Sequence, residues 1–278
     1  MISNIKILEE KANSLRKDII QMICVSKSGH PGGSLSSADI VTALYFYEMN
    51  IDPKNPKMDG RDRFVLSKGH AAPVLYAALA ERGYFSKDTL VTLRQYGSML
   101  QGHPDMKKVP GVEISTGSLG QGLSVANGMA LSAKISKKDY RTYVLMGDGE
   151  LQEGQIWEAA MTAAHYKLDN VCAFVDFNNL QIDGNVDQIM GVEPLDKKWE
   201  AFGWNVLKID GHDMKAILGA LASAKECKGQ PTIIICETTK GKGVSFMENV
   251  CGFHGVAPNE EEAARAISEL EHVEKIEN

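Results

Sequence analysis

An acidic side chain and an amide side chain each follow an apolar run of this sequence, thirty positions apart (178 − 148 = 30). Asp148 lies between two glycines after the apolar residues 143–146, and Asn178 follows the apolar run 171–175. Both runs are typical of buried parallel strands. Ligands of parallel sheets bind outside the carboxyl ends of the strands, so Asp148 and Asn178 are expected to converge. Two oxygen donors beside glycines predict a divalent cation that bridges a diphosphate.

Four of the seven histidines lie in loops marked by glycine or proline. They are His30 in SGHPGG, His70 in SKGHAAP, His103 in QGHPD and His254 in GFHGV. Loops at strand ends commonly carry function, and a neutral imidazole can donate or accept a proton near physiological pH. These four are therefore candidates for binding or catalysis. His165 and His212 lack such settings and are expected to be structural or solvated.

The segments that must position these residues alternate between helical and extended patterns. Helical periodicity covers residues 4–27, 38–47, 73–82, 123–134, 156–163, 199–202, 214–227 and 260–277, and strand-like runs cover 63–66, 143–146, 171–175, 205–209 and 232–238. Residues 28–37 and 182–195 are expected to be loops, with Ser37 capping the helix that follows it. This alternation predicts an α/β fold, a mostly parallel sheet with helices on both faces.

Length and composition restrict the class of protein. A chain of 278 residues fits one large α/β domain, predicted as residues 1–258, with a helical tail over 259–278. The net charge of −6 argues against nucleic acid as a partner. Membrane-spanning and signal-peptide patterns are lacking, and the five cysteines form no CxxC pair. We therefore expect a cytoplasmic protein with no membrane partner.

GDG followed about thirty residues later by asparagine is the signature of thiamine diphosphate enzymes, and the chain resembles the transketolase family. The resemblance implies the thiamine diphosphate-binding (PP-type) fold, with thiamine diphosphate as the cofactor. It also implies a divalent metal ion, Mg²⁺ or else Ca²⁺ or Mn²⁺. Its ligands would be Asp148, Asn178 and the backbone carbonyl of Leu180.

The resemblance assigns roles to further residues. His70 would contact the diphosphate region, and His30, His103 and His254 would contact the hydroxyls and carbonyl of a sugar substrate. The cofactor-binding residues implied are Ser118, Leu119 and Gly120 along the thiazolium and diphosphate, and Gly147 and Gly149 beside Asp148. Glu153 corresponds to an acidic residue of a proton relay in the family. An acidic residue that favours the N-terminus of a helix is an equally good explanation of Glu153.

The resemblance covers residues 4–258 but only the first part of a full-length transketolase. A pyrimidine-binding domain, which supplies a glutamate to the cofactor, and a C-terminal domain follow in the family. The chain therefore resembles the N-terminal subunit of a split transketolase, active only with a C-terminal partner subunit, in an α₂β₂ heterotetramer. Such an enzyme moves a two-carbon ketol unit from a ketose or ketose phosphate donor to an aldose acceptor, as in the pentose phosphate pathway. Which sugars are used is left open.

Two alternatives remain open at this stage. The α subunit of a 2-oxoacid dehydrogenase E1 component is also part of a split thiamine diphosphate enzyme with a GDG motif. The loops GHPGG, DRFVLSKGH and GHPD favour transketolase, because they suit a substrate with many hydroxyls. A non-catalytic protein that kept the cofactor site is the second alternative. A nicotinamide-binding Rossmann domain is excluded, because no GxGxxG follows the first strand.

Overall fold

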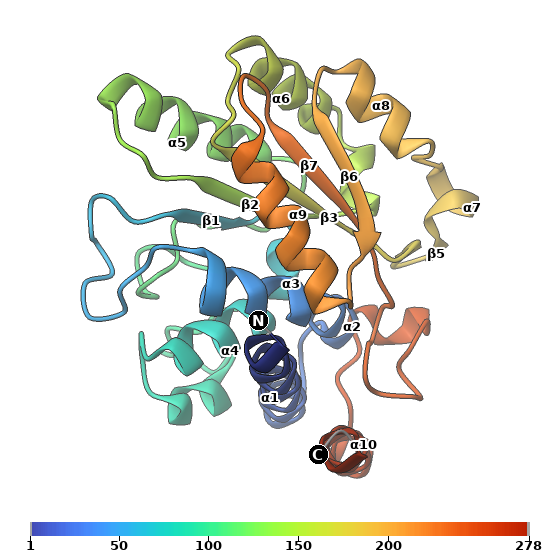
Figure 1. The fold of residues 1–278 in the computed structure, drawn as a ribbon. Helices are drawn as coiled ribbons and strands as arrows, with labels where there is room; N and C mark the ends of the chain where they lie inside the picture. The colour runs from blue at the N-terminus through green and yellow to red at the C-terminus, as the bar shows by residue number, and fades with distance from the viewer. Residues whose placement is uncertain (1, 277–278) are drawn as a thin grey trace.

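The protein is built on a five-stranded parallel sheet with the order β1-β2-β3-β7-β6. The computed structural model describes residues 2–276. The strands are β1 (Arg63–Leu66), β2 (Thr142–Gly147), β3 (Val171–Phe177), β6 (Asn205–Asp210) and β7 (Thr232–Glu237) (Figure 1). All five strands predicted from the sequence are present, and the predicted parallel α/β fold is confirmed.

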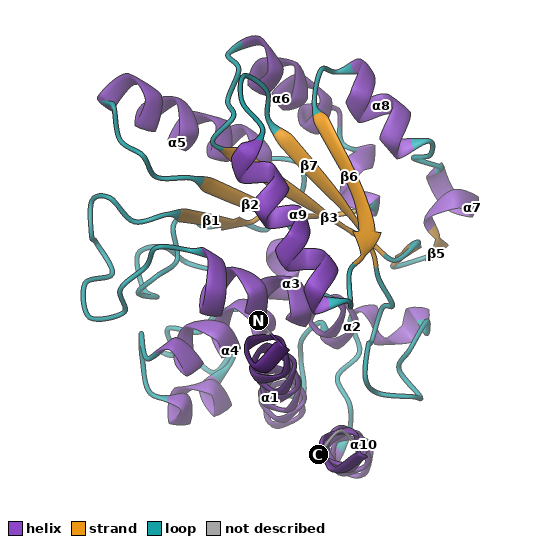
Figure 2. Cartoon of the chain, viewed as in Figure 1, coloured by secondary structure: helices purple, strands orange, loops and turns teal. Residues whose placement is uncertain are grey.

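Helices cover both faces of this sheet (Figure 2). One layer contains α1 (Ile2–Ser26), α3 (Ala38–Ala43), α4 (Ala72–Arg82) and α9 (Met214–Glu226). The other contains α5 (Gly122–Ser136), α6 (Gly154–His165) and α8 (Leu195–Ala201). Each layer forms its own hydrophobic core with the sheet face that it covers, which is why the central strands are apolar along their whole length.

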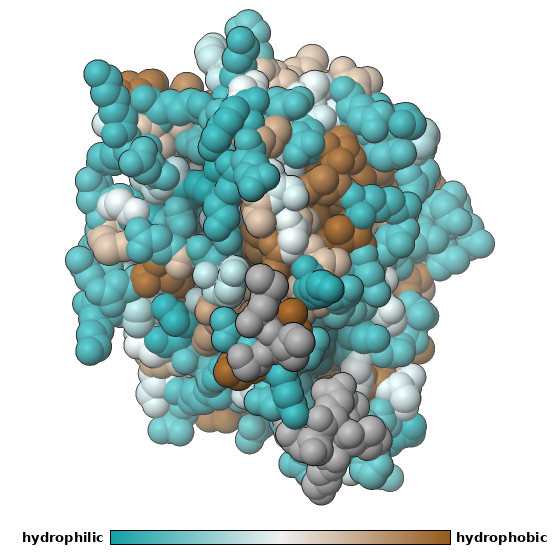
Figure 3. All heavy atoms as spheres, viewed as in Figure 1, coloured by the Kyte–Doolittle hydropathy of each residue, from teal (hydrophilic) through white to brown (hydrophobic). Residues whose placement is uncertain are grey.

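Side chains alternate between the two cores along each strand. In β2, Tyr143 and Leu145 pack with the α1 layer, whereas Val144 and Met146 pack with the α5 layer. This alternation is the period of two that a pleated strand imposes. The edge strand β6 has no fully buried residue, and Figure 3 shows hydrophobic residues at the surface over it.

The glycine-rich segment 28–37 differs from its prediction as a loop. Pro31–Ser36 forms a short helix, α2, whose six residues are all buried. Proline at the first helical position explains the start, since its fixed φ suits a helix and its missing N–H costs nothing there. Ser37 does not cap α3 with its side chain; its hydroxyl donates to the carbonyl of Gly33 at 2.8 Å. The predicted helix 38–47 continues after α3 as a wider π-helical turn, Leu44–Glu48.

The predicted loop 182–195 is also partly regular. β4 (Leu180–Gln181) and β5 (Gly184–Asn185) form a small antiparallel hairpin, followed by α7 (Val186–Met190). α8 begins at Leu195, four residues before the predicted start at Trp199 (199 − 195 = 4). Short elements of this kind have too few residues for a periodic pattern to be recognised in the sequence.

The C-terminal helix α10 (Glu260–Ile276) packs against α1. Ala266 and Leu270 are buried there, and the side-chain amide of Asn13 donates to the carbonyl of Leu270 at 2.8 Å. The prediction extended this helix to residue 277, which lies outside the described residues, as do residues 1 and 278. Within residues 2–276 no helix is both long enough and apolar enough to cross a membrane.

Candidate active site

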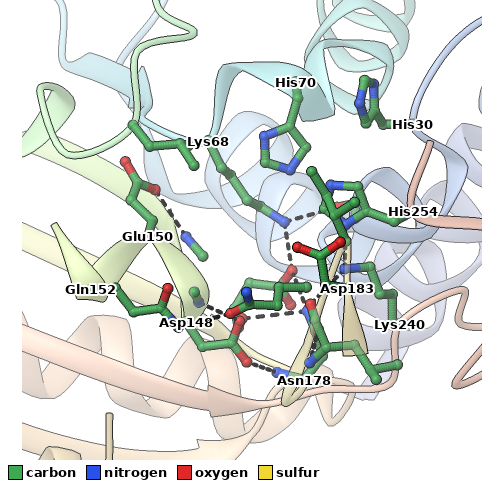
Figure 4. A pocket seen from close by; sticks show the side chains of 18 of the residues that line it. His30, Lys68, His70, Asp148, Glu150, Gln152, Asn178, Asp183, Lys240 and His254 are labelled. Atoms are coloured by element: carbon green, nitrogen blue, oxygen red, sulfur yellow. Dashed lines mark hydrogen bonds and ion pairs between the residues drawn. The ribbon is translucent and has the colours of Figure 1, made fainter. Parts of the chain in front are cut away.

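A cavity of about 300 Å³ lies at the carboxyl ends of the central strands (Figure 4). The predicted site residues that line it are His30, His70, Leu119, Gly147, Asp148, Gly149, Glu153, Asn178, Leu180 and His254. Residues from the ends of β1, β2, β3 and β7 meet there because parallel strands place their carboxyl ends on the same edge of the sheet.

Asp148 and Asn178 converge as the spacing predicted. They follow β2 and β3, which are adjacent and pair Gly147 with Asp176. One carboxylate oxygen of Asp148 accepts the backbone N–H of Asn178 at 3.0 Å and that of Asn179 at 2.5 Å. The other accepts the N–H of Gly149 at 2.7 Å. The Asp148 carboxylate is therefore fixed between the two strand ends.

Its hydrogen-bond partners are backbone amides, which carry no net charge to compensate the carboxylate. Burial, together with the nearby negative charge of Asp176, raises the pKa of Asp148 to about 6. The backbone hydrogen bonds and the more distant Lys240 act in the opposite direction without offsetting the burial. A cation beside Asp148 would favour its ionised form.

A buried ion pair that the sequence analysis did not identify forms the floor of the cavity. The ammonium of Lys68 lies 2.5 Å from a carboxylate oxygen of Asp176 and donates to the carbonyl of Gly33 at 2.8 Å. Ser36 and Thr238 donate to the same carboxylate at 2.7 and 2.5 Å. The available signal was a charged residue, Asp176, at the end of an otherwise apolar strand.

Lys240 is a second buried cation of the cavity. Its ammonium donates to the carbonyl of Leu180 at 2.6 Å and contacts Nδ1 of His254 at 2.7 Å. Burial, reinforced by repulsion from Lys68, lowers the pKa of Lys240 to about 8. This residue follows β7 in the KGKG segment, which precedes His254 in the sequence and drew no prediction of its own.

Three of the four candidate histidines form one cluster. The ring centroids of His30 and His70 are 5.2 Å apart, those of His70 and His254 are 5.2 Å apart, and those of His30 and His254 are 5.5 Å apart. His30 and His70 lie at the starts of helical segments, and His254 closes a 3₁₀ turn after β7. Segments far apart in the chain thus bring three imidazoles to one side of the cavity.

All three imidazoles of the cluster are neutral at physiological pH. Burial and the charge of Lys68 lower the pKa of His70 to about 2. Burial and the charge of Lys240 lower the pKa of His254 to about 3. Burial and the charge of Arg94 lower the pKa of His30 to about 4. A neutral imidazole can accept or donate a hydrogen bond, as a sugar hydroxyl or carbonyl requires.

Three predicted site residues do not line this cavity. Ser118 is exposed, Gly120 is buried beneath the loop surface, and His103 lies beside the cavity against Gly117. A Cβ on Gly117 would be 2.8 Å from Cδ2 of His103, so glycine allows this contact. His103 is close enough to His30 for its charge to lower the pKa of His30, so it belongs to the same region.

Glu150, which the sequence analysis did not identify, is buried beside the cavity, whereas Glu153 is exposed on its rim. The Glu150 carboxylate accepts hydrogen bonds from Ser67, from the N–H of Gly120 at 2.9 Å and from the N–H of Gly147 at 3.1 Å. Glu153 occupies the position before the first residue of α6 but makes no side-chain cap.

His212 supports the site from outside, in agreement with a structural role. Its Nε2 accepts the backbone N–H of Thr239 at 2.8 Å, so Nδ1 carries the proton and donates to Asp39 at 2.7 Å. Asp39 is in turn paired with Arg16 of α1 at 2.5 Å. This buried chain holds the segment just before Lys240.

Comparison with known proteins agrees with this architecture. Residues 7–274 match the family model described as the transketolase thiamine diphosphate binding domain. One of the two subunits of the apulose-4-phosphate transketolase of Phocaeicola vulgatus is 45% identical over 98% of this chain and 97% of that protein. The 6-deoxy-6-sulfo-D-fructose transketolase subunit of a Clostridium species is 48% identical over 95% of this chain and 96% of that protein.

Solved structures give the same result. A transketolase from Campylobacter jejuni superposes with a TM-score of 0.90 at 39% identity. The match covers 96% of this chain but 43% of the Campylobacter chain. Fold and site thus define a domain that binds thiamine diphosphate. The chain belongs to the transketolase family, and the predicted resemblance is confirmed.

Proposed function

We propose that this chain is the N-terminal subunit of a split transketolase. The observation that carries the proposal is the convergence of Asp148 and Asn178 beside a cluster of neutral histidines, in a chain as long as relatives that are themselves named transketolase subunits. With a C-terminal partner it transfers a two-carbon ketol unit from a ketose, or ketose phosphate, to an aldose. Membership of the transketolase family argues against a dehydrogenase E1 subunit.

The residues around Asp148 fit a divalent metal ion, Mg²⁺ or else Ca²⁺ or Mn²⁺. Asp148, the side-chain oxygen of Asn178 and the carbonyl of Leu180 form an all-oxygen donor set, which these hard cations prefer. The buried Asp148 carboxylate, with its raised pKa, is the charge that such a cation would neutralise. The ammonium of Lys240 occupies one lone pair of the Leu180 carbonyl and leaves the other free.

Thiamine diphosphate supplies, when bound, an electron sink for breaking a carbon–carbon bond beside a carbonyl. The chain's own residues would bind its diphosphate through the metal, the N–H of Gly149 and His70. Gly147 and the loop of Ser118, Leu119 and Gly120 would lie along the cofactor. His30, His103 and His254 would hold the substrate oxygens and accept or donate protons at their ring nitrogens. Glu153 would belong to a proton relay.

The partner proposed is a C-terminal subunit that carries the pyrimidine-binding and C-terminal domains, in an α₂β₂ assembly. The solved transketolase whose first part this chain matches is more than twice as long. We place the cofactor-binding domain at residues 1–258, the tail at 259–278, and the complex in the cytoplasm. The two relatives described above carry different sugars in their names, so family membership alone does not identify the donor.

The proposal is tested by reconstitution. The chain is expressed alone and with a candidate C-terminal subunit, supplied with thiamine diphosphate and Mg²⁺, and assayed for ketol transfer from xylulose 5-phosphate to ribose 5-phosphate. We expect activity only in the mixture; apulose 4-phosphate and 6-deoxy-6-sulfo-D-fructose are assayed as further donors. Activity of the isolated chain would contradict the requirement for a partner, and activity on pyruvate alone would favour a dehydrogenase subunit.

The metal assignment has its own test. Asp148→Ala is expected to abolish Mg²⁺-dependent binding of thiamine diphosphate, measured by calorimetry. Asp139→Ala, at an exposed site near the opposite end of β2, serves as the matched control and should bind as the unmodified chain does. Unchanged binding by Asp148→Ala would refute the proposed ligand.

A further inference from the structure

Glu150 lies where three backbone segments of the site meet, and its side chain is only 2% exposed. One carboxylate oxygen accepts hydrogen bonds from the hydroxyl of Ser67 and the N–H of Gly120, and the other accepts the N–H of Gly147. Ser67 follows β1, Gly147 ends β2, and Gly120 belongs to the loop before α5. A single carboxylate therefore links two strand ends to a loop that is distant in sequence.

The same segments are packed too closely for any side chain at their contact points. A Cβ on Gly122 would lie 2.3 Å from the hydroxyl oxygen of Ser67, and a Cβ on Gly69 would lie 2.7 Å from the backbone nitrogen of Gly117. The loop 116–122 is thus in direct contact with the segment 67–69. Because Gly117 and Leu119 line the cavity together with His70, the separation of these segments determines the width of the cavity.

We propose that Glu150 is a positioning residue, which fixes the loop 117–120 against the ends of β1 and β2 at the width that the diphosphate of the cofactor requires. This inference rests on the proposed function. Glu150 does not need to touch the cofactor for this role. An ionised carboxylate only accepts hydrogen bonds, so it can satisfy all three donors at once, whereas a carboxamide must present an N–H₂ group to at least one of them.

Glu150→Gln keeps the shape of the side chain and removes this acceptor-only character. We expect the affinity for thiamine diphosphate at saturating Mg²⁺ to fall at least about tenfold, since a buried donor left facing a donor is costly and the loop shifts. Affinity is measured by calorimetry on the full chain with its C-terminal subunit. Amide hydrogen exchange of the chain alone is expected to accelerate in the segments containing Gly120 and Gly147, and to stay unchanged in β3 and β7.

Glu158→Gln is the matched control, because Glu158 is exposed on α6 and the chemical change is identical. It should alter neither affinity nor exchange. Affinity of Glu150→Gln equal to that of the unmodified chain would overturn the proposal. Faster exchange throughout the sheet, β3 and β7 included, would also overturn it, since Glu150 would then stabilise the fold in general.

Ser67→Ala decides the matter if Glu150→Gln does not fold. It removes one of the three donors and should lower the affinity for thiamine diphosphate by a smaller factor, about threefold, with faster exchange in the segment containing Gly120. No change in either quantity would overturn the proposal. If the unmodified complex does not bind thiamine diphosphate at all, the proposed function fails, and the exchange pattern alone decides whether Glu150 holds the three segments together.

Discussion

Lys68 and Asp176 form an ion pair in the interior of the protein, with exposed fractions of 2% and 0%. Opposite charges are stable at such depth only when their hydrogen-bonding capacity is also met. Here Ser36 and Thr238 donate to Asp176, and the carbonyl of Gly33 accepts from Lys68. The pair lies under the cavity and connects β1, β3 and α2, so it supports the site and the fold together.

Removing the cation alone should be strongly destabilising. Lys68→Met leaves Asp176 as an uncompensated buried charge, and we expect the free energy of unfolding to fall by about 3–5 kcal/mol. The double variant Lys68→Met with Asp176→Asn should recover part of this loss, because the second change removes the unpaired charge. Urea unfolding of the three proteins measures both effects. A single variant as stable as the unmodified chain would contradict this account.

The neutral histidines make stability depend on pH. The pKa of His70 is lowered from 6.5 to about 2 in the fold, so between these values the unfolded chain binds a proton that the folded chain does not. Stability is therefore highest above about pH 6.5 and is lost as the pH falls, at up to about 1.4 kcal/mol per pH unit for this side chain. His30 and His254 act in the same direction.

Urea unfolding between about pH 7 and pH 5 measures this dependence. His70→Gln should make it shallower, because one of the contributing groups is gone. His165→Gln is the control, since His165 lies on α6 and outside the cavity. Equal slopes for His70→Gln and the unmodified chain would show that another group dominates.

At the scale of elements, the sheet could be predicted from the sequence and the short helices could not. The runs that became β2, β3 and β7 are apolar on both faces because two helix layers bury them, and such runs are recognisable. α2 contains two glycines and two serines, which are poor helix formers, and it is stabilised by tertiary burial instead.

The candidate site shows the same division. Asp148 and Asn178 could be placed because strand ends converge by topology alone. Lys68, Glu150 and Lys240 could not, because their importance depends on partners that lie far away in the sequence, 108 residues in the case of Lys68 and Asp176. A buried charge cannot be told from a surface charge by its local sequence when its partner comes from another element.

The packing of α10 on α1 is a second feature that residue patterns left undefined. Leu270 is buried between these helices. Leu270→Ala should lower the free energy of unfolding by about 2–5 kcal/mol, through lost burial and the cavity left behind. Binding of thiamine diphosphate should be unaffected at temperatures where the variant is folded. Met161→Ala, at an exposed site on α6, is the control and should change stability little. Loss of cofactor binding without loss of stability would mean that α10 acts on the site directly.

At the scale of the whole molecule, the cavity is bordered by apolar surface that suits a partner. Ile182 lines the cavity and is 70% exposed, and Met190 of α7 is 62% exposed. Exposed apolar side chains at the rim of a site are typical of protein–protein contacts. If the proposed C-terminal subunit completes the cofactor site, it must approach this rim, and the hairpin of β4 and β5 would lie in the interface.

Ile182→Lys tests this arrangement, because a charge buried in an interface without a partner is costly. We expect the affinity for the C-terminal subunit to fall at least about tenfold, measured by analytical ultracentrifugation, while the thermal unfolding of the isolated chain stays unchanged. Ile135→Lys is the matched control: Ile135 is 74% exposed but lies at the end of α5, near the amino ends of the strands. If Ile135→Lys weakened assembly and Ile182→Lys did not, the subunits would meet at the opposite edge of the sheet, and the cavity would have to bind the cofactor without the partner.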